Sequence, residues 1–517
     1  MLTEELAFLF NNRGNAILAR GDNVAAIASY RKALYFKPDH HSALSNLGNA
    51  LRDTGQVSEA EAACRSALRL MPGFPEAWNN LGTALSAQGR GDEAADCFSS
   101  ALKLRPDFPE ARHNFYSGQL FNLLMNPEVG EHEILARHRA WGLSFPPVAA
   151  STRKVKALSA DRPMRVGYLS ADFREHAMRH YLEPALAHHD RSRVELTCYA
   201  NSPISDEATR RLMGYGHAWV WTHTLGDQEL AARIRSDEID ILVDCIGHTR
   251  GTRLDALASK PAPVMVSWLG YLGTTGLPAM DFRLTDAWVD PPGLTESQHT
   301  EKLLRLAGGM MAYRPHLHVP DANALPSQSS GRITFGSLNN LDKLNLGVVQ
   351  TWAALLDVVP GSRLLLQTKA LVDPGMSGHV RGMFEAFGIG RDRLELRPAS
   401  ADFLLTYHEI DVALDTFPYG GGATTCDALW MGVPVITCSG KRPAGRLTTS
   451  ILHQIGRPQW AAETLQAYIE KARQVASDAA SLAAERSRLR QRVQASTLCD
   501  GPGFARRLEQ LLLSLLH

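Results

Sequence analysis

A loop of glycines followed by two hydroxyls offers the clearest chemistry in the sequence. Residues 417–423 hold three consecutive glycines, and Thr424 and Thr425 follow directly. Glycine lets a backbone turn tightly and come close to a ligand. Threonines at the start of a helix would add hydroxyls to its unpaired N–H groups and partial positive charge, which suits a diphosphate. The alternative is an ordinary strand–turn–helix in which the threonines cap the helix, and the loop alone does not separate the two.

A histidine follows another predicted strand. Residues 165–171 read as a strand that runs on to His176, where an imidazole could act as a general base. His180 stands four residues further on, so a metal pair is also considered. The zinc-protease motif requires Glu directly after the first histidine, and Ala177 stands there instead. A purely structural role for either histidine, such as a helix cap, remains the alternative.

A lysine follows a strand of the second half of the chain in the same manner. Lys343 could place a positive charge on a leaving diphosphate, with Asn340 near the sugar or phosphate. The alternative is a solvated loop lysine. No D-x-D pair occurs in the chain, so we expect no metal and no cofactor. The charge of a diphosphate would then be met by Lys343, the helix dipole and the hydroxyls.

The elements that must position these groups alternate between strands and helices. Short apolar strands are expected on either side of the glycine loop, at 411–415 and 433–437, with a helix over 426–431. From Arg165 onward, further strands alternate with helical patterns, which is typical of parallel sheets covered by helices. A segment rich in Pro, Gly and charge, 286–325, suggests a crossing between two such domains. Two doubly wound domains would bind a ligand at the carboxyl ends of their strands.

The N-terminal part of the chain is repetitive instead. Small residues and prolines recur every 34 residues, which is the tetratricopeptide pattern of paired antiparallel helices. The recurring positions are Gly14, Gly48 and Gly82, Ala33, Ala67 and Ala101, and Pro38, Pro72 and Pro106. Three repeats and a partial fourth from Glu110 suffice for a stable stack.

An asparagine also recurs in these repeats. Asn12, Asn46, Asn80 and Asn114 occupy the same repeat position, so stacking would align them along the concave face. An amide both donates and accepts, so such a ladder could bind a peptide backbone with little side-chain preference. The alternative is that each amide bonds its own helix or solvent. We interpret Asn46, Asn80 and Asn114 as acceptor-binding residues.

The bulk composition narrows the classes of function. The 517 residues are 44% hydrophobic, and 54 basic residues balance 54 acidic ones, so the charge balance does not indicate nucleic-acid binding. The N-terminus is acidic where a signal peptide is basic, and no apolar run is long enough to cross a bilayer. The seven cysteines show no C-x-x-C or zinc spacing, which fits a reducing compartment. We expect a cytoplasmic protein that binds neither nucleic acid nor membrane.

Four motifs, taken together with the repeats, resemble a known family. They are RVGYLSADFREH, KPAPVMVSWLGYLGTTG, FGSLNNLDK and DTFPYGGGATTCDALWMGVPV. A tetratricopeptide array followed by these motifs in this order is similar to the O-GlcNAc transferases and their SPINDLY-type relatives. The resemblance implies a GT-B fold, a pair of Rossmann-like domains. It also implies inverting, metal-independent transfer of a sugar to Ser or Thr of proteins.

The resemblance assigns roles to individual residues. His176 matches the family's active-site histidine, a proposed base, and Lys343 the diphosphate-binding lysine. Thr424 matches a phosphate-binding threonine, and Asp427 the carboxylate that holds the ribose. Where the animal enzymes have a Lys and a His beside the nucleotide base, this chain has Ser400 and Phe403. The expected nucleotide-sugar site therefore comprises Asn340, Ser400, Phe403, Gly421, Gly422, Ala423, Thr424, Thr425 and Asp427.

Some positions depart from the animal pattern. Ala423 stands where that pattern has His before the two threonines, and Leu272 replaces the Pro of the GYPGT loop. The motif around Pro418 and the tail 496–502 look more like the SPINDLY type, whose plant members use GDP-fucose. We expect UDP-GlcNAc as the donor, with GDP-fucose as the alternative and protein or peptide acceptors on the repeats. A catalytically inactive tetratricopeptide scaffold is the remaining alternative, and retained charged groups argue against it.

The expected organisation is α + α/β, a helical solenoid followed by a GT-B pair. We assign residues 1–118 to the repeats, 119–162 to a bridging helical segment and 163–325 to the first Rossmann-like domain. Residues 326–517 form the second, nucleotide-binding domain with closing C-terminal helices.

Overall fold

The computed structural model describes residues 2–147 and 162–516. The chain divides into two compact units, which are described separately below. The first unit comprises Met1–Asn122, Leu338–Ala353 and Leu364–Ala401, and the second comprises Leu123–Ser337, Ala354–Arg363 and Asp402–His517. The domain boundaries given above stay predictions.

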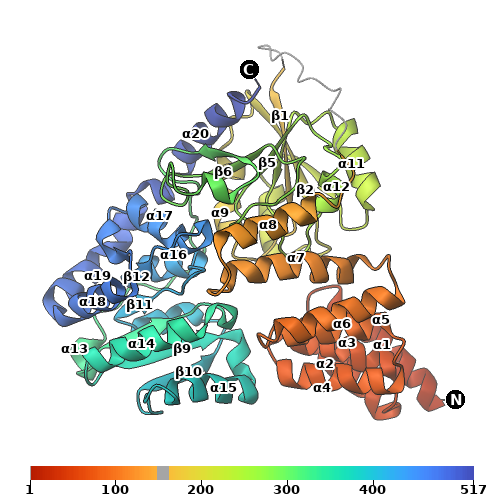
Figure 1. Cartoon of the computed structure of the whole chain (residues 1–517), viewed down its shortest axis with the longest axis horizontal. Helices are drawn as coiled ribbons and strands as arrows, with labels where there is room; N and C mark the ends of the chain where they lie inside the picture. Colours follow the sequence, from red (N-terminus) through yellow and green to blue (C-terminus); the bar gives the residue numbers. More distant parts are fainter. Residues whose placement is uncertain (1, 148–161, 517) are drawn as a thin grey trace. The chain divides into compact units, whose positions relative to one another are not determined.

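Three helix pairs open the first unit, as the 34-residue period predicts. They are α1 (Leu2–Leu18) with α2 (Asn23–Phe36), α3 (His41–Asp53) with α4 (Val57–Leu70), and α5 (Pro75–Ser86) with α6 (Gly91–Leu104). Helix α7 (Pro109–Met125) follows them (Figure 1). The repeated glycines lie where paired helices touch. A Cβ atom at Gly48 would lie 2.4 Å from the Cys64 sulfur, and one at Gly82 would lie 2.5 Å from the Phe98 ring.

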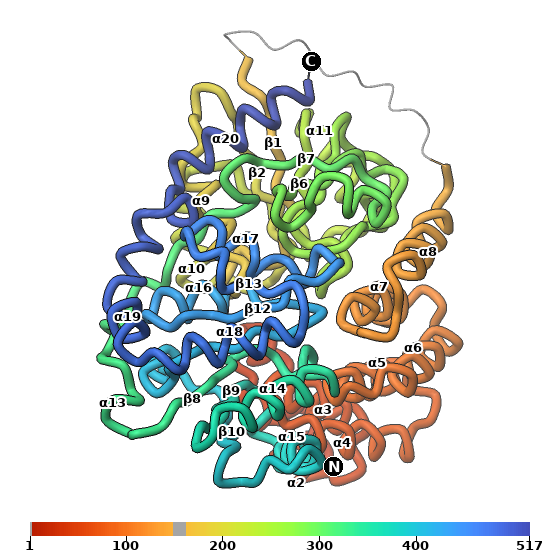
Figure 2. Tube along the Cα trace, turned by 60° about the vertical axis from the view of Figure 1, so that its left-hand side comes forward, coloured from red at the N-terminus to blue at the C-terminus, as the bar shows by residue number. Residues whose placement is uncertain are grey.

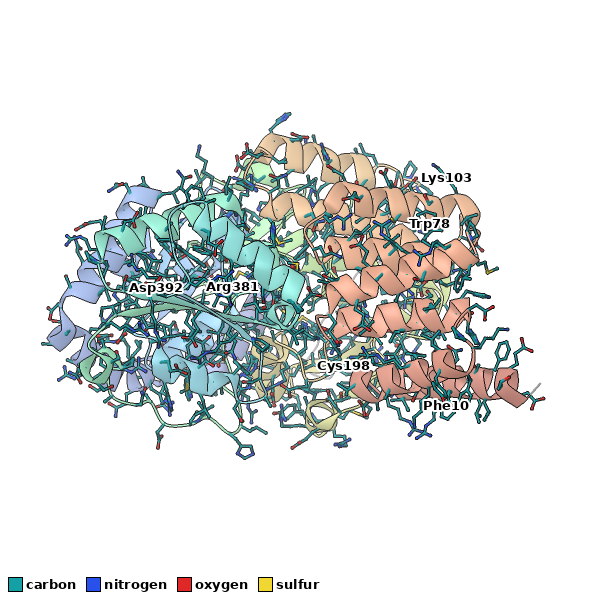
Figure 3. The ribbon with its side chains drawn as sticks, turned by 90° about the horizontal axis from the view of Figure 1, so that it is seen from below. Phe10, Trp78, Lys103, Cys198, Arg381 and Asp392 are labelled. Carbon is teal, nitrogen blue, oxygen red and sulfur yellow. The ribbon has the colours of Figure 1, made fainter. Side chains whose placement is uncertain are left out.

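The repeats also contact the segment 364–401 of the same unit. Asp373 is buried and caps α15 (Pro374–Glu385) by accepting a hydrogen bond from Met376 N. The same carboxylate accepts from the Ser58 backbone N–H and hydroxyl, both at 2.8 Å, in the first turn of α4. Figure 3 shows both parts of this unit, with Trp78 on the repeats and Arg381 on α15. One aspartate therefore holds the starts of two helices together.

The first parallel sheet lies in the second unit. Its order is β3 (Ala218–Trp221), β2 (Val194–Ala200), β1 (Met164–Ser170), β4 (Ile241–Asp244), β5 (Val264–Ser267), β6 (Phe282–Thr285) and β7 (Lys302–Arg305). Strands β4 and β5 are buried throughout, because helices cover both faces of such sheets. The strand order reverses direction between β1 and β4, which is where doubly wound folds bind ligands.

A second parallel sheet has the same topology. Its order is β10 (Leu394–Pro398), β9 (Arg363–Thr368), β8 (Thr334–Ser337), β11 (Val412–Leu414), β12 (Val435–Cys438) and β13 (Ala461–Ala462). The reversal falls between β8 and β11, which pair in parallel. Repeats followed by two Rossmann-like sheets confirm the predicted fold class. The closing helices are α18 (Leu465–Ser477), α19 (Ala479–Gln494) and α20 (Gly501–Leu513). Figure 2 traces α20 alongside α9 (Arg179–His188).

The bridging segment packs onto a loop of the first sheet. Helix α8 (Glu131–Gly142) lies in the predicted bridging helical segment 119–162, and residues 148–161 of that segment lie outside the described residues. His138 of α8 hydrogen-bonds the Tyr271 hydroxyl at 2.6 Å. A Cβ atom at Gly142 would lie 1.9 Å from the Gly276 carbonyl oxygen. Backbone contact this close leaves no room for any residue except glycine at position 142.

The segment 286–325 is more than the crossing between domains that its composition indicates. Strand β7 lies inside it and closes one edge of the first sheet by pairing with β6. Prolines and glycines dominate the composition and hide the short strand, because β7 has only four residues. In the part of the chain that is described, no helix is long and apolar enough to cross a membrane.

Candidate functional site

Helix α16 (Ala423–Trp430) starts three residues earlier than the sequence predicts. Gly422 is the residue that caps it, and no side chain makes a capping hydrogen bond. Thr424 and Thr425 therefore lie inside the first turn, where backbone N–H groups have no partner within the helix. The interpretation of these threonines as ordinary helix caps is wrong. Their position matches an anion-binding helix start instead.

Buried Asp415 organises the glycine loop. One oxygen accepts hydrogen bonds from the Gly421 N–H at 2.6 Å and the Thr416 N–H at 3.0 Å. The other oxygen accepts from the Thr437 hydroxyl at 2.7 Å. The carboxylate is 1% exposed, so each of these donors would be left without water if it were removed. Asp415 therefore fixes the end of β11 to the loop that follows it.

The loop approaches its neighbours too closely for side chains. A Cβ atom at Gly421 would lie 2.7 Å from the Thr425 hydroxyl and 2.9 Å from the Thr424 hydroxyl. At Gly422 it would lie 3.2 Å from the Tyr181 hydroxyl of α9. The two threonine hydroxyls thus lie directly over the glycine backbone. Thr425 is buried and its hydroxyl shares a hydrogen bond of 3.0 Å with the Thr448 hydroxyl, so a phosphate could bond the Thr425 hydroxyl only in place of that contact.

Asp427 lies one turn further along α16 and is also buried. Its Oδ1 accepts a hydrogen bond of 2.7 Å from the Tyr313 hydroxyl. The His316 Nε2 lies 3.5 Å from the same oxygen. The Phe403 ring, where the family resemblance places a base-binding residue, packs edge-on against His316 with a centroid distance of 5.6 Å. Phe403, His316 and Asp427 therefore form one cluster.

The chain around Tyr313 is anchored to the start of α9. The Arg314 N–H donates to the His180 carbonyl at 2.7 Å, and the His180 Nδ1 bonds the Arg314 carbonyl at 2.6 Å. The Arg314 guanidinium lies 3.2 Å from Glu183, which is fully buried. Burial would raise the pKa of Glu183, but hydrogen bonds from Arg211 and Tyr215 and the charge of Arg314 hold it below its usual value. This network holds Tyr313 and His316 next to Asp427.

His176 follows β1 at the point where the strand order reverses. Its Nδ1 accepts a hydrogen bond from the Met178 N–H at 3.3 Å and lies 3.4 Å from Asp172 Oδ1. The imidazole keeps 40% of its surface exposed. Burial lowers the pKa of His176 below its usual value, although the charge of Asp172 opposes this. This direction of the pKa favours the neutral imidazole, which is the form that a general base requires.

His180 does not join His176 in a metal pair. Helix α9 begins at Arg179, so the two histidines do not share a helical face. Burial and the neighbouring charges of His316 and Arg179 lower the pKa of His180 to about 4. Its role in the described contacts is to hold Arg314 and to stack on Tyr313. Among residues 2–147 and 162–516, no group of three or more His, Cys, Asp or Glu is placed to hold a metal ion.

Three of the sequence-predicted residues belong to the first unit. Lys343 ends a short 3-10 helix, Leu341–Lys343, and its Nζ donates to Asn339 at 3.3 Å. Asn340 precedes this helix and is exposed, as is Ser400 after β10. Lys343 and Asn340 follow β8, whereas the glycine loop follows β11, its parallel neighbour. Both follow strands at the point where the second sheet reverses its order.

The repeated asparagines form a ladder across the repeats. Asn46 donates to Asn11 and to Asn15 at 3.0 Å, Asn80 to the Ser45 hydroxyl at 3.0 Å, and Asn114 to Asn79 at 2.8 Å. Each amide therefore bonds the residue 35 positions earlier, on the preceding repeat. The amide nitrogens are used between repeats, and the oxygens are the groups left to accept from a peptide.

Sequence reasoning misses the residues around Asp427. Tyr313 and His316 lie in the segment whose composition indicates only a crossing between domains. The available signal for these residues in the sequence is that a Tyr and a His flank Arg314-Pro315. Asp415 stands in the sequence only as the end of a predicted strand, although it organises the predicted phosphate loop.

The family models match most of the chain. The model described as glycosyl transferase family 41 matches residues 143–312 and 308–508. Tetratricopeptide repeat models match residues 42–71 and 75–108.

Several named proteins are similar to this chain. A tomato (Solanum lycopersicum) protein named probable UDP-N-acetylglucosamine–peptide N-acetylglucosaminyltransferase SPINDLY is 35% identical over 77% of this chain and 44% of its own length. The Caenorhabditis elegans UDP-N-acetylglucosamine–peptide N-acetylglucosaminyltransferase is 26% identical over 68% of this chain and 40% of its own length. The chain thus spans less than half the length of these relatives.

A solved structure extends the similarity over the whole chain. The Thermobaculum terrenum O-GlcNAc transferase, solved as a lysine-to-methionine mutant, matches with a TM-score of 0.89 and 33% identity. The match covers 100% of this chain and 98% of that one. With the family model across both Rossmann-like sheets and the repeats in front of them, the chain belongs to glycosyl transferase family 41.

Proposed function

We propose that this chain is an inverting protein O-glycosyltransferase that transfers GlcNAc from UDP-GlcNAc to Ser or Thr of protein acceptors. The observation that carries the proposal is the glycine loop held by Asp415 against the first turn of α16. The relatives' printed names supply the donor, and the repeats supply a surface for protein acceptors. A cytoplasmic setting fits the seven cysteines, all of which are free thiols.

In the proposed mechanism, the donor diphosphate lies at the start of α16. The Thr424 and Thr425 hydroxyls and backbone N–H groups bind its oxygens, and Asp427 holds the ribose. As the bond to the leaving diphosphate breaks, negative charge grows on it, and Lys343 meets that charge. The acceptor hydroxyl attacks from the opposite face of the sugar and loses its proton to neutral His176. No metal is expected to take part.

GDP-fucose remains the alternative donor. The glycine-loop motif favours it, because that motif resembles the SPINDLY type. An inactive scaffold is the other alternative.

Nucleotide binding followed by mass spectrometry tests the proposal. A nucleotide that binds the folded state raises its melting temperature, so UDP and GDP are compared first. The chain is then incubated with either donor and a Ser/Thr-rich protein, and the product mass is measured. UDP stabilisation and a GlcNAc mass shift are expected. If GDP stabilised the chain and the product gained the mass of fucose, the donor would be GDP-fucose instead. If the product gained neither the mass of GlcNAc nor that of fucose, the proposal would be overturned.

The proposed base predicts an acid limb in the pH profile. Because His176 must be neutral to accept a proton, turnover should be full at pH 7 and fall as the pH drops through its pKa. Since burial lowers that pKa, the fall should be centred below about 6.5. Rates are measured at saturating donor and acceptor. His176→Ala should leave a slow rate that lacks this limb, and a limb of wild-type shape in that variant would contradict the assignment.

The asparagine ladder predicts a selective loss. Replacing Asn46, Asn80 and Asn114 together with Ala should weaken glycosylation of protein substrates and leave slow donor hydrolysis intact. The reason is that the ladder oxygens contact only the acceptor in this proposal. Both rates are compared in one preparation, with circular dichroism as a check on folding because inter-repeat hydrogen bonds are also lost. Equal loss of both activities would indicate a folding defect instead.

A further inference from the structure

A series of contacting charged and polar side chains connects Glu175, the residue before the proposed base His176, to Asp427. Arg179 has a buried side chain, only 5% exposed, and its Nε donates to Glu175 at 2.8 Å. Another guanidinium nitrogen lies 3.4 Å from the His316 Nδ1. The other ring nitrogen, Nε2, lies 3.5 Å from Asp427 Oδ1. The order of contacts is therefore Glu175, Arg179, His316 and Asp427.

The arginine determines which nitrogen of His316 carries the proton. A guanidinium only donates hydrogen bonds, so the His316 Nδ1 must accept from Arg179. The proton of the neutral ring then stays on Nε2, the atom nearest Asp427. This tautomer gives His316 one accepting side and one donating side. The buried Arg179 therefore determines that the protonated nitrogen of the His316 ring faces the Asp427 carboxylate.

The two oxygens of Asp427 are used differently. Oδ1 accepts from the Tyr313 hydroxyl at 2.7 Å and faces His316. Among the described residues, none donates a hydrogen bond to Oδ2. The Tyr313 hydrogen bond fixes the position of Oδ1, and the polar contact with the His316 Nε2 at 3.5 Å restricts the plane of the carboxylate. The second oxygen is thereby held ready for hydroxyls of a ligand.

We propose that Arg179 and His316 are positioning residues that orient Asp427 toward the ribose hydroxyls of the donor nucleotide. This inference rests on the proposed function, because it assumes that a nucleotide binds beside α16. Glu175, which starts the relay, directly precedes His176. The relay therefore ties the segment that carries the proposed base to the group that holds the donor.

Nucleotide titrations by calorimetry test the relay. Wild type, His316→Ala, His316→Gln and the control His318→Ala are titrated with UDP and GDP, and with their 2′,3′-dideoxy forms. His318 is an exposed neighbour with no part in the cluster. The loss of the polar contact between His316 and the Asp427 carboxylate should weaken binding of the ribonucleotide by about tenfold in His316→Ala. The dideoxy nucleotide should bind wild type and His316→Ala equally, since it lacks the hydroxyls that Asp427 accepts.

The remaining variants separate the possible outcomes. In His316→Gln, the new side-chain amide can accept from Arg179 and donate to Asp427, so this variant should recover part of the affinity. His318→Ala should match wild type. Equal weakening of both nucleotide forms would show a general structural role and overturn the relay, as would unchanged binding in His316→Ala. A wild-type chain that binds neither UDP nor GDP would overturn the proposed function itself.

Discussion

Lys343→Met should abolish detectable transfer while leaving the chain folded. In an inverting displacement, the sugar carbon becomes cation-like and negative charge grows on the leaving diphosphate. Removing one preorganised electrostatic contact typically costs on the order of a hundredfold or more in rate. Water or a phosphate oxygen can partly replace a base, but neither can replace a cation. His176→Ala should therefore retain more activity than Lys343→Met.

Single-turnover transfer at saturating donor measures this difference. Lys302→Met is a matched control, because Lys302 is an exposed lysine on the edge strand β7 of the other sheet. It should behave like wild type. Circular dichroism checks that all variants fold. Near-normal turnover in Lys343→Met would remove the lysine from the site, together with most of the mechanism proposed above.

Asp415→Ala should cause the second largest effect, on both stability and nucleotide binding. It leaves the Gly421 and Thr416 N–H groups and the Thr437 hydroxyl without their buried acceptor. An unsatisfied buried donor costs about 1–3 kcal/mol, so with three donors the free energy of unfolding should fall by about 3–9 kcal/mol in total. The glycine loop would also lose the contact that holds it against α16. Chemical denaturation and nucleotide titration measure the two effects.

Asp415→Asn is the matched control for this prediction. Its amide oxygen can still accept from Gly421 and Thr416, and its nitrogen can donate to the Thr437 hydroxyl, which both donates and accepts. Stability should therefore stay near that of wild type. If Asp415→Ala were as stable as Asp415→Asn and bound nucleotide equally well, the carboxylate would not organise the loop.

Local patterns in the sequence predict many of the regular elements. The 34-residue period predicts the helix pairs, and short apolar runs predict β1 and β11 to within one residue at each end. The predicted start of α16 is wrong because Ala423, Thr424 and Thr425 follow three glycines and resemble loop residues. In the structure the helix begins at Ala423, because Gly422 caps it without a side-chain hydrogen bond.

The surroundings of Asp427 could not be predicted, because they depend on long-range contacts. Tyr313 lies 114 positions from Asp427 in the chain, inside a segment whose prolines suggest only a connection. Nothing in its local pattern indicates that hydrogen bonds to His180 would bring it to α16. His176 and Lys343, by contrast, follow predicted strands, where their residue types alone indicate chemistry, and the role of Asp427 is what the family resemblance implies.

A crystal structure with the nucleotide that stabilises the chain most tests the central claim most directly. We expect the diphosphate at the start of α16, with its oxygens within hydrogen-bond distance of the Thr424 and Thr425 hydroxyls and N–H groups. The ribose should lie against Asp427. A nucleotide bound elsewhere, with the first turn of α16 contacting only protein, would contradict the proposed donor site.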